Sequence, residues 1–501
     1  MNVVVVGAGA GGLAAAIALA AAGRRVRVYE AQQHVGGKIG TAVVGASTEE
    51  GTEEVGVEVD TGPTVLTLPE VVEAVFARGR ARMSDHVTLV RPSPAFRYCF
   101  ADSETPLDVF VDVNETLASV RSTLGADAEH DLAAFLKHAK AIWDASKDDF
   151  VFAPAPTLPR LVRLALLHPV KLFAVDALRS MATSIEAQVR SPELRLLLLR
   201  YASYNGSDPY TAPATLSCIA HVELALGGFG VKGGMAALAR ALRDVAERVG
   251  VEFVVGARVD RVVVEGGRAR GVDVGGSFVS ATDVVVNADV GWLRETKTLA
   301  PSPSARLAPS MSGATAILKA KRRPQRVAHE VLFSRDYAHE TRTIFDEARP
   351  PDEPTIYLCA LEKAHARRGW RGHEPVFAMI NVPPLGARGT ATVKNSGAND
   401  GGADLDALER GLERARVRGL VERDDSVVWT RDARALARDF PGSHGSLYGA
   451  SSNDRSAAFL RPKNQSDVEG LFLASGSAHP GGGVPLCLQS GLLAADALLR
   501  R

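Results

Sequence analysis

The first 30 residues place short apolar runs on either side of a glycine-rich turn and a helix. Residues 2–6 are a β-branched run, residues 13–22 are rich in Ala and Leu and end at Gly23, and residues 26–29 form a second short run. A strand, a helix and a strand in this order pair the two strands in parallel, with the helix as the crossover. The N-terminus is therefore predicted to begin a parallel α/β sheet.

Later apolar runs predict further strands and a final helix. The runs with the length and β-branched composition of strands are residues 251–255, 259–264, 271–274, 284–287 and 471–474. Two long stretches interrupt them: residues 80–230 are helical and mixed with proline breaks, and a second stretch runs from about 291 to 440. Within the second stretch, the polar, Gly-rich residues 386–404 are expected to form a mobile surface loop.

Composition excludes some classes of function. Lys+Arg and Asp+Glu both number 58, so the chain lacks the positive charge that would hold a nucleic acid, and no nucleic-acid partner is expected. The four cysteines, Cys99, Cys218, Cys359 and Cys487, lie far apart without metal-ligand spacing, so no metal site is expected.

The apolar segments also bear on location. The sequence begins without the basic leader of a secretory signal, and no apolar run approaches the roughly 20 residues of a spanning helix. We expect a cytoplasmic protein with at most peripheral contact to the cytoplasmic membrane. Residues 158–183 mix Leu, Val and Phe with basic residues, which suits helices on an anionic membrane surface, although an ordinary core helix pair has the same composition.

The turn after the first run carries a dinucleotide fingerprint. Residues 7–12 (GAGAGG) fit GxGxxG through Gly7, Gly9 and Gly12. The first glycine permits the tight turn, the second lets the backbone approach a pyrophosphate, and the third lets the helix pack on the sheet. Glu30 ends the second strand, where a carboxylate can accept hydrogen bonds from ribose hydroxyls.

The continuation resembles a flavoprotein motif. Residues 30–38 (EAQQHVGGK) are similar to the ExxxxxGGR/K extension of amine oxidases, protoporphyrinogen oxidases and carotene desaturases. The resemblance implies FAD, with Gly36 and Gly37 against the cofactor and Lys38 near the pyrophosphate or ribityl chain; an ordinary surface lysine is the alternative for Lys38. No second fingerprint follows an expected strand, so we expect electrons to leave to oxygen or a quinone.

The other end of the chain resembles the same group of enzymes. Residues 470–485 (GLFLASGSAHPGGGVP) are similar to the GxxTHPGGGVP segment of bacterial carotenoid desaturases, with Ala478 in place of the threonine. A helix that begins after these glycines can stabilise negative charge on a reduced flavin. Residues 60–66 (DTGPTVL) resemble the DxGPTV stretch beside the isoalloxazine ring in this family.

These resemblances imply a discontinuous Rossmann-like FAD-binding domain of the glutathione-reductase/amine-oxidase type with an inserted α+β substrate domain. The expected FAD-binding parts are residues 1–75, 231–290 and 441–501, and the substrate domain is built from residues 76–230 and 291–440. The cofactor-binding residues implied are Gly7, Gly9, Gly11, Gly12, Glu30, Gly36, Gly37, Lys38, Gly62, Pro63, Thr64, Val255, Gly476, Gly483, Val484 and Pro485.

The substrate domain suggests a narrower class. Residues 107–110 and 233–235 also resemble the phytoene desaturase-like family, and residues 200–216 with 220–223 look closer to its hydroxyneurosporene and methoxyneurosporene desaturases. The resemblance implies 3,4-desaturation of an acyclic 1-hydroxy or 1-methoxy carotenoid by hydride transfer to flavin N5. Tyr204 and His221 are candidate substrate-binding residues, with Glu223 beside them. His479 is a candidate base, although a histidine there also suits a bond to a backbone carbonyl.

Other enzymes remain open from the sequence: a phytoene desaturase, a carotenoid isomerase, or another member of the flavin amine oxidase superfamily such as a protoporphyrinogen oxidase. An amine oxidase would want an aromatic pair near the C-terminal flavin segment. No Trp or Tyr occurs between Gly449 and Arg501, which counts against an amine substrate.

Overall fold

The computed structural model describes most of the chain. The described residues are 2–44, 56–157, 174–300, 302–386 and 402–501, with Pro159, Arg163, Leu166 and Leu167 between them. Nearly all of the predicted loop at residues 386–404, and much of the predicted membrane-surface segment at residues 158–183, lie outside the described residues.

A five-stranded parallel sheet forms the first layer of the fold. Its order is β19-β13-β1-β2-β9, and every adjacent pair is parallel. The strands are β1 (Asn2–Val6), β2 (Arg25–Tyr29), β9 (Glu252–Val254), β13 (Asp283–Val286) and β19 (Leu471–Leu473). β13 and β19 are buried along their whole length and β1 after its first residue, as expected of parallel strands covered on both faces. The predicted parallel α/β sheet is confirmed, and it joins segments from both ends and the middle of the chain.

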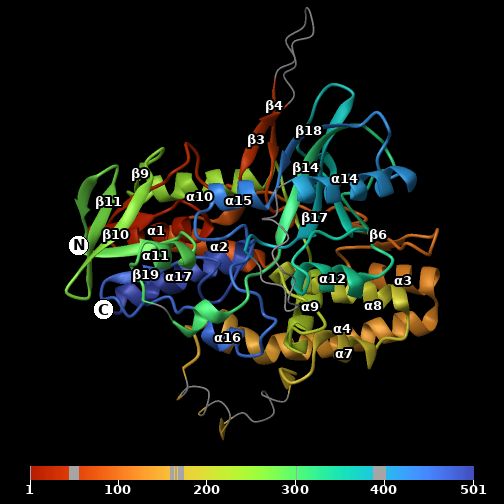
Figure 1. Ribbon diagram of the computed structural model, residues 1–501, viewed down its shortest axis with the longest axis horizontal. Helices are drawn as coiled ribbons and strands as arrows, with labels where there is room; N and C mark the ends of the chain where they lie inside the picture. Colours follow the sequence, from red (N-terminus) through yellow and green to blue (C-terminus); the bar gives the residue numbers. More distant parts are fainter. Residues whose placement is uncertain are drawn as a thin grey trace, which may run out of the picture.

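Helices α1 (Ala10–Ala21) and α17 (Val484–Leu499) pack together on this sheet, although they come from opposite ends of the sequence. Figure 1 shows them side by side in red and blue, with both termini at the same end of the molecule. Small residues allow the contact: a Cβ added at Gly491 of α17 would lie 2.2 Å from the Gly11 carbonyl oxygen of α1. Helices α2 (Pro69–Arg78) and α10 (Met235–Arg248) contribute buried Val, Phe, Leu and Met side chains to the same core.

Small antiparallel sheets complete the two regions, one packed with the parallel sheet and another with the second region of the fold. β10 (Val259–Glu265), β11 (Arg268–Val274) and β12 (Ser277–Ser280) form a three-stranded meander, turned by the pairs Gly266–Gly267 and Gly275–Gly276 with positive φ. β3 (Thr41–Val44) pairs with β4 (Val57–Asp60). β4 ends at Asp60, which is the first residue of the stretch that resembles DxGPTV.

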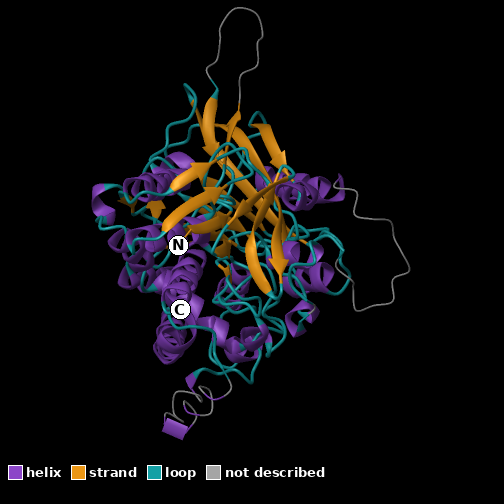
Figure 2. Ribbon diagram, turned by 90° about the vertical axis from the view of Figure 1, so that its left-hand side faces the viewer, coloured by secondary structure: helices purple, strands orange, loops and turns teal. Residues whose placement is uncertain are grey.

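A seven-stranded sheet forms the second region, to the right in Figure 1. Its order is β18-β14-β17-β16-β15-β6-β7, antiparallel except for β15 beside β6. The strands are β6 (Phe96–Cys99), β7 (Leu107–Val109), β14 (Ser312–Lys321), β15 (His329–Leu332), β16 (Ile356–Ala360), β17 (His373–Val382) and β18 (Ser426–Arg431). Figure 2 shows the strands of the fold in orange, with helices on either side of them. The sheet therefore unites the two stretches that interrupt the sequence pattern.

The helices of the second region surround this sheet. They are α3 (Val113–Leu124), α4 (Ala126–Ser146), α7 (Met181–Glu186), α8 (Pro192–Leu199), α9 (Cys218–Leu224), α12 (Tyr337–Phe345) and α14 (Gly402–Val417). The remaining short helices are α11 (Val290–Glu295), α13 (Leu361–His365), α15 (Ala433–Asp439) and α16 (Ala457–Leu460).

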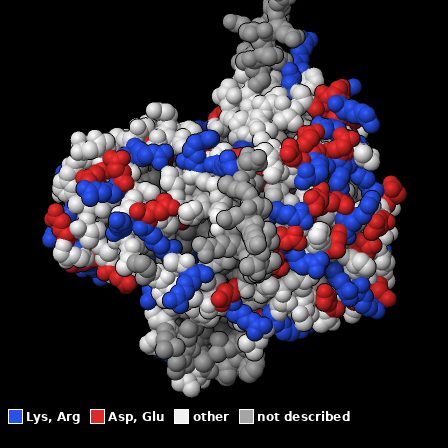
Figure 3. Space-filling view, viewed as in Figure 1, with Lys and Arg blue, Asp and Glu red and all other residues white. Residues whose placement is uncertain are grey.

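The surface carries both signs of charge. On the face in Figure 3, Lys and Arg lie among Asp and Glu, and neither sign forms a continuous patch. Among the described residues, no helix is both long enough and apolar enough to cross a membrane.

Candidate active site

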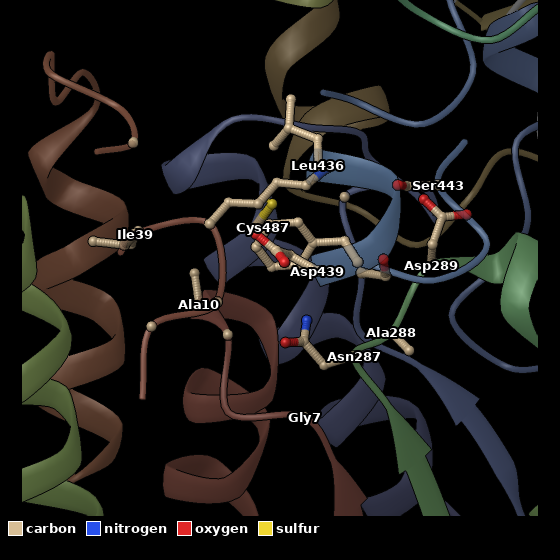
Figure 4. Close-up of a pocket in the computed structure, with 18 of the residues that line it drawn as sticks. Gly7, Ala10, Ile39, Asn287, Ala288, Asp289, Leu436, Asp439, Ser443 and Cys487 are labelled. Atoms are coloured by element: carbon tan, nitrogen blue, oxygen red, sulfur yellow. The ribbon is translucent and has the colours of Figure 1, made fainter. Parts of the chain in front are cut away.

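The main cavity opens beyond the carboxyl ends of β1, β2 and β13, where ligands of open α/β sheets bind. Its empty volume, counted to its open mouth, is about 1760 Å³. The wall includes the turn after β1, the end of β2, the residues after β13 and the turn before α17, as Figure 4 shows in part. The far side of the wall comes from β14 and β17 of the seven-stranded sheet.

Asn287, directly after β13, joins the two glycine turns. Its side-chain amide donates a hydrogen bond to the Ala474 carbonyl, which follows β19. A Cβ added at Gly9 would lie 2.5 Å from the Asn287 Oδ1. A Cβ at Gly11 would lie 2.0 Å from the Ala474 carbonyl oxygen. The backbone atoms of the turns at the two ends of the sequence therefore lie so close together that no Cβ fits between them. Only glycine permits this contact.

The N-termini of α1 and α17 both reach the cavity. Their N-cap residues are Gly9 and Gly483, and neither cap has a side-chain hydrogen bond to the first turn. Backbone N–H groups at both helix starts are thus free of side-chain caps and carry the positive end of the helix dipole. One uncapped helix start fits a pyrophosphate, and the other fits the electron-rich edge of a flavin. The residues present fit FAD.

Glu30, directly after β2, also lines the cavity. Its carboxylate is buried and accepts hydrogen bonds from the Ala8 N–H at 2.6 Å and the Gln32 N–H at 2.8 Å. Arg258 and Val259 line the cavity here too. The carboxylate is therefore fixed where β2 ends, the position at which a nucleoside ribose binds in this fold.

Lys38 is neither an exposed lysine nor a free cation. Its ammonium donates to the carbonyls of Ser446 at 2.9 Å and Leu447 at 2.8 Å, and it lies 5.6 Å from the centre of the Phe440 ring. Burial lowers its pKa, against the opposing charge of Asp289. Lys38 thus connects the N-terminal motif to the loop that precedes the C-terminal one, and it borders the cavity.

Most of the residues predicted from the sequence reach the cavity. The ones that line it are Gly7, Gly9, Glu30, Gly36, Gly37, Lys38, Gly62, Pro63, Gly476, Gly483 and Val484. Gly11, Gly12, Thr64, Val255 and Pro485 are not part of the described lining. Gly11 and Gly12 are instead packing positions, since a Cβ at Gly12 would lie 2.0 Å from the Gly7 carbonyl oxygen.

The candidate base, His479, lies away from the cavity lining. Its imidazole is buried, and Nε2 lies 2.9 Å from the Ala153 carbonyl oxygen. This matches the backbone-carbonyl alternative. His221 is also buried, and its charged neighbours Lys140 and Asp144 belong to α4, so its imidazole faces that helix. Tyr204 instead donates to Glu223, in a cluster beside the cavity wall.

Several lining residues were not identified from the sequence. Asn287 and Asp289 follow β13, and burial raises the pKa of Asp289. Tyr448 packs against the C-terminal glycines: a Cβ at Gly482 would lie 2.7 Å from the Tyr448 Cβ. Tyr448 directly precedes Gly449, so the lack of Trp and Tyr after Gly449 does not reveal it.

The wall beyond the glycine turns is largely apolar. It includes Trp292, Phe377, Met379, Leu436 and Phe440. Arg431 also lies there; it donates to the Thr61 carbonyl, and burial lowers its pKa. This side of the cavity therefore offers a hydrocarbon surface beside a site that fits FAD.

Comparison with known proteins gives the family. Residues 10–370 match the flavin containing amine oxidoreductase family. The chain is 32% identical to a hydroxyneurosporene desaturase of Rubrivivax gelatinosus, over 99% of this chain and 93% of that protein. It is 33% identical to a hydroxyneurosporene desaturase of Rhodobacter capsulatus, over 99% and 97%.

The fold also agrees with a solved structure. Putrescine oxidase with bound putrescine superposes with a TM-score of 0.60 at 16% identity, covering 100% of both chains. These findings confirm the resemblance seen in the glycine motifs and the Rossmann-like fold class. The chain therefore belongs to the flavin containing amine oxidoreductase family, in its phytoene desaturase-like branch, and is an FAD-dependent oxidoreductase.

Proposed function

We propose that this enzyme desaturates an acyclic carotenoid, with a 1-hydroxy or 1-methoxy carotenoid as substrate and the 3,4-bond as the site. The observation that carries the proposal is the full-length identity of 32% and 33% to two hydroxyneurosporene desaturases. The apolar wall of the cavity supports it, because a polyene offers no charge and few polar atoms for recognition.

Bound FAD would supply the two-electron acceptor, at flavin N5, for a hydride from the substrate. The protein's own contribution is to hold and orient. Glu30 and the uncapped start of α1 would hold the nucleoside and pyrophosphate, and the start of α17 would face the ring. Phe377 and Met379 would exclude water and hold the chain of the carotenoid against the ring.

The domain layout follows the same proposal. Residues 1–75, 231–290 and 441–501 would bind FAD, and residues 76–230 and 291–440 would bind the carotenoid. The exposed side chains of Leu166, Leu167 and Leu178, all in residues 158–183, support a peripheral site on the cytoplasmic membrane, where carotenoids dissolve. Oxygen or a quinone would then take the electrons.

Expression in cells that accumulate defined acyclic carotenoids tests the proposal. With a 1-hydroxy or 1-methoxy carotenoid, we expect a product that has lost two hydrogens and absorbs further to the red. A Gly9→Val variant is the matched control, since its side chain would collide with Asn287 at the glycine turn. Unchanged pigment in every strain would contradict the proposal, and a product of unchanged mass would identify an isomerase instead.

A further inference from the structure

A buried polar cluster lies beside the substrate side of the cavity. It consists of Arg200, Glu223 and three tyrosines, Tyr98, Tyr201 and Tyr204, and is called the Arg200 cluster below. Glu223 on α9 is 4% exposed, and Arg200, which follows α8, is 9% exposed. Burying a charge of each sign so deeply is costly, so their arrangement requires a reason.

Arg200 is enclosed by aromatic rings. Its guanidinium carbon lies 5.6 to 6.0 Å from the ring centres of Phe96, Tyr98, Tyr204 and Tyr357. Two buried polar atoms of this cluster, Arg200 Nη1 and the Tyr98 hydroxyl, have no hydrogen-bond partner. The cluster therefore retains unused hydrogen-bonding capacity, as expected where a ligand binds.

Glu223 accepts a hydrogen bond on each carboxylate oxygen. The Tyr201 hydroxyl donates to Oε1 at 3.0 Å, and the Tyr204 hydroxyl donates to Oε2. Burial raises the pKa of Glu223, opposed by the charge of Arg200 and by both tyrosine hydrogen bonds. Burial also raises the pKa of Tyr204 well above that of a free tyrosine, so its hydroxyl keeps its proton.

Three contacts, two made by neighbours of the cluster and one by Glu223, place the cluster near the cavity wall. The Tyr357 hydroxyl lies 2.6 Å from the Thr64 Oγ1, next to the lining residue Pro63. A Cβ at Gly206, two residues after Tyr204, would lie 2.8 Å from Cδ2 of the lining residue Tyr448.

The third contact involves Glu223 itself. A Cβ at Gly228 would lie 3.0 Å from the Val65 side chain and 3.6 Å from the Glu223 Cγ. Val65 belongs to the DxGPTV stretch, so side-chain atoms of Glu223 and of that stretch both lie within 4 Å of the Cβ position of Gly228. The cluster is thus packed between the DxGPTV stretch and Tyr448, both of which border the FAD site.

We propose that Tyr204 and Glu223 form the proton-accepting pair of the desaturation. This rests on the proposed function. A C=C bond forms when a hydride leaves one carbon for the flavin and a proton leaves the neighbouring carbon. The electron pair of the second C–H bond becomes the π bond. The proton passes to the Tyr204 oxygen as the hydroxyl proton of Tyr204 passes to the Glu223 Oε2, so Glu223 ends protonated.

The two tyrosines differ in access. Tyr201 is 0% exposed, whereas Tyr204 is partly exposed. Of the two tyrosines that bond Glu223, Tyr204 is therefore the one with exposed surface. Tyr201 holds the other oxygen of the carboxylate and serves as the matched control.

The test uses the holoenzyme with Tyr204→Phe, Glu223→Gln and Tyr201→Phe variants. We expect the first two to lower kcat by about 100-fold or more, the range of general acid–base catalysis, and Tyr201→Phe to lower it by less than about 10-fold. Retained flavin absorbance and unchanged binding of the desaturated product, measured by quenching of protein fluorescence, show that FAD and carotenoid sites remain intact.

A second readout follows the proton itself. Infrared titration of the protein should show a carboxylic acid band that disappears in Glu223→Gln and titrates above the range of an ordinary glutamate. In the wild type, kcat should fall as the pH decreases through this pKa, because the base must be ionised. The groups that face Glu223, namely Arg200, Tyr98, Tyr201 and Tyr204, set that pKa, and the first three remain in Tyr204→Phe.

Wild-type turnover in Glu223→Gln or Tyr204→Phe, or an equal loss in Tyr201→Phe, would overturn the assignment while leaving the desaturase function in place. A wild-type enzyme that converts no carotenoid would instead overturn the proposed function, and the proton-accepting pair with it.

Discussion

The FAD side of the cavity is held by backbone packed against backbone, whereas the substrate side is held by buried side chains that pair with one another. Gly11 meets Ala474, and Gly491 meets Gly11, at distances that leave no room for a Cβ. On the substrate side, Arg200 and Glu223 are surrounded by tyrosines. A glycine contact tolerates no added atom, while a side-chain cluster tolerates exchange of one member and changes its chemistry. Substitutions on the FAD side should therefore disturb packing, whereas substitutions on the substrate side should change the chemistry of the cluster.

The largest difference is expected between two glycines inside helices. Gly491→Ala places a methyl group 2.2 Å from a backbone oxygen of α1, and backbone cannot move aside without shifting the helix. We expect a loss of about 1–3 kcal/mol in the free energy of unfolding, with weaker FAD binding. Chemical denaturation and flavin absorbance measure both.

Gly411→Ala in α14 is the matched control. Its added Cβ would meet only side chains, the nearest being Ile380 Cγ2 at 3.3 Å. Alanine has the better helix propensity, by up to about 1 kcal/mol, so stability should be unchanged or slightly raised. Equal losses in the two variants would show that the FAD side is not specially constrained.

The bridge between the glycine turns gives the next effect. Asn287→Ala removes the amide that donates to the Ala474 carbonyl and leaves this acceptor unpaired. We expect the free energy of unfolding to fall by about 1–2 kcal/mol and FAD to be released faster. The control is Asn114→Ala, at an exposed position in the first turn of α3. Its free energy of unfolding should stay within about 0.5 kcal/mol of the wild-type value. Unchanged FAD release in Asn287→Ala would remove the bridging role.

The smallest effect is expected on the substrate side. Tyr357→Phe removes a hydroxyl that lies 2.6 Å from the Thr64 Oγ1 and 2.7 Å from the His329 Nδ1. The stability loss should be about 1 kcal/mol, with FAD content unchanged. Loss of FAD from purified Tyr357→Phe would show that the two sides are coupled more closely than their contacts indicate.

The same contrast explains what the sequence could reveal. Glycines at fixed spacing after a strand have one main physical use, so the sequence alone identifies the turns at residues 7–12 and 476–484. The parallel sheet followed from short β-branched runs. Asn287 carried no such signal, because a single asparagine after a strand is common and its role depends on a segment nearly 190 residues away.

The substrate side was much harder to predict. The sequence does not predict the individual strands of the seven-stranded sheet. For example, β14 (SGATAILKAK) has the Ala and Lys content of a helix, and it is a strand because it pairs with β17 and β18. The Arg200 cluster gathers residues from β6, α9 and the segment after α8. No spacing in the sequence brings those residues together. His479 attracted attention through its motif, yet its imidazole contacts the Ala153 carbonyl.

The claim on which the rest depends is that the glycine turns from both ends of the chain bind one FAD. Hydrogen–deuterium exchange of the protein, with and without added FAD, tests it most directly. Amides in residues 7–12 and in residues 476–487 should both become protected at the same FAD concentration. Protection of the first segment alone, or of neither, would contradict the claim.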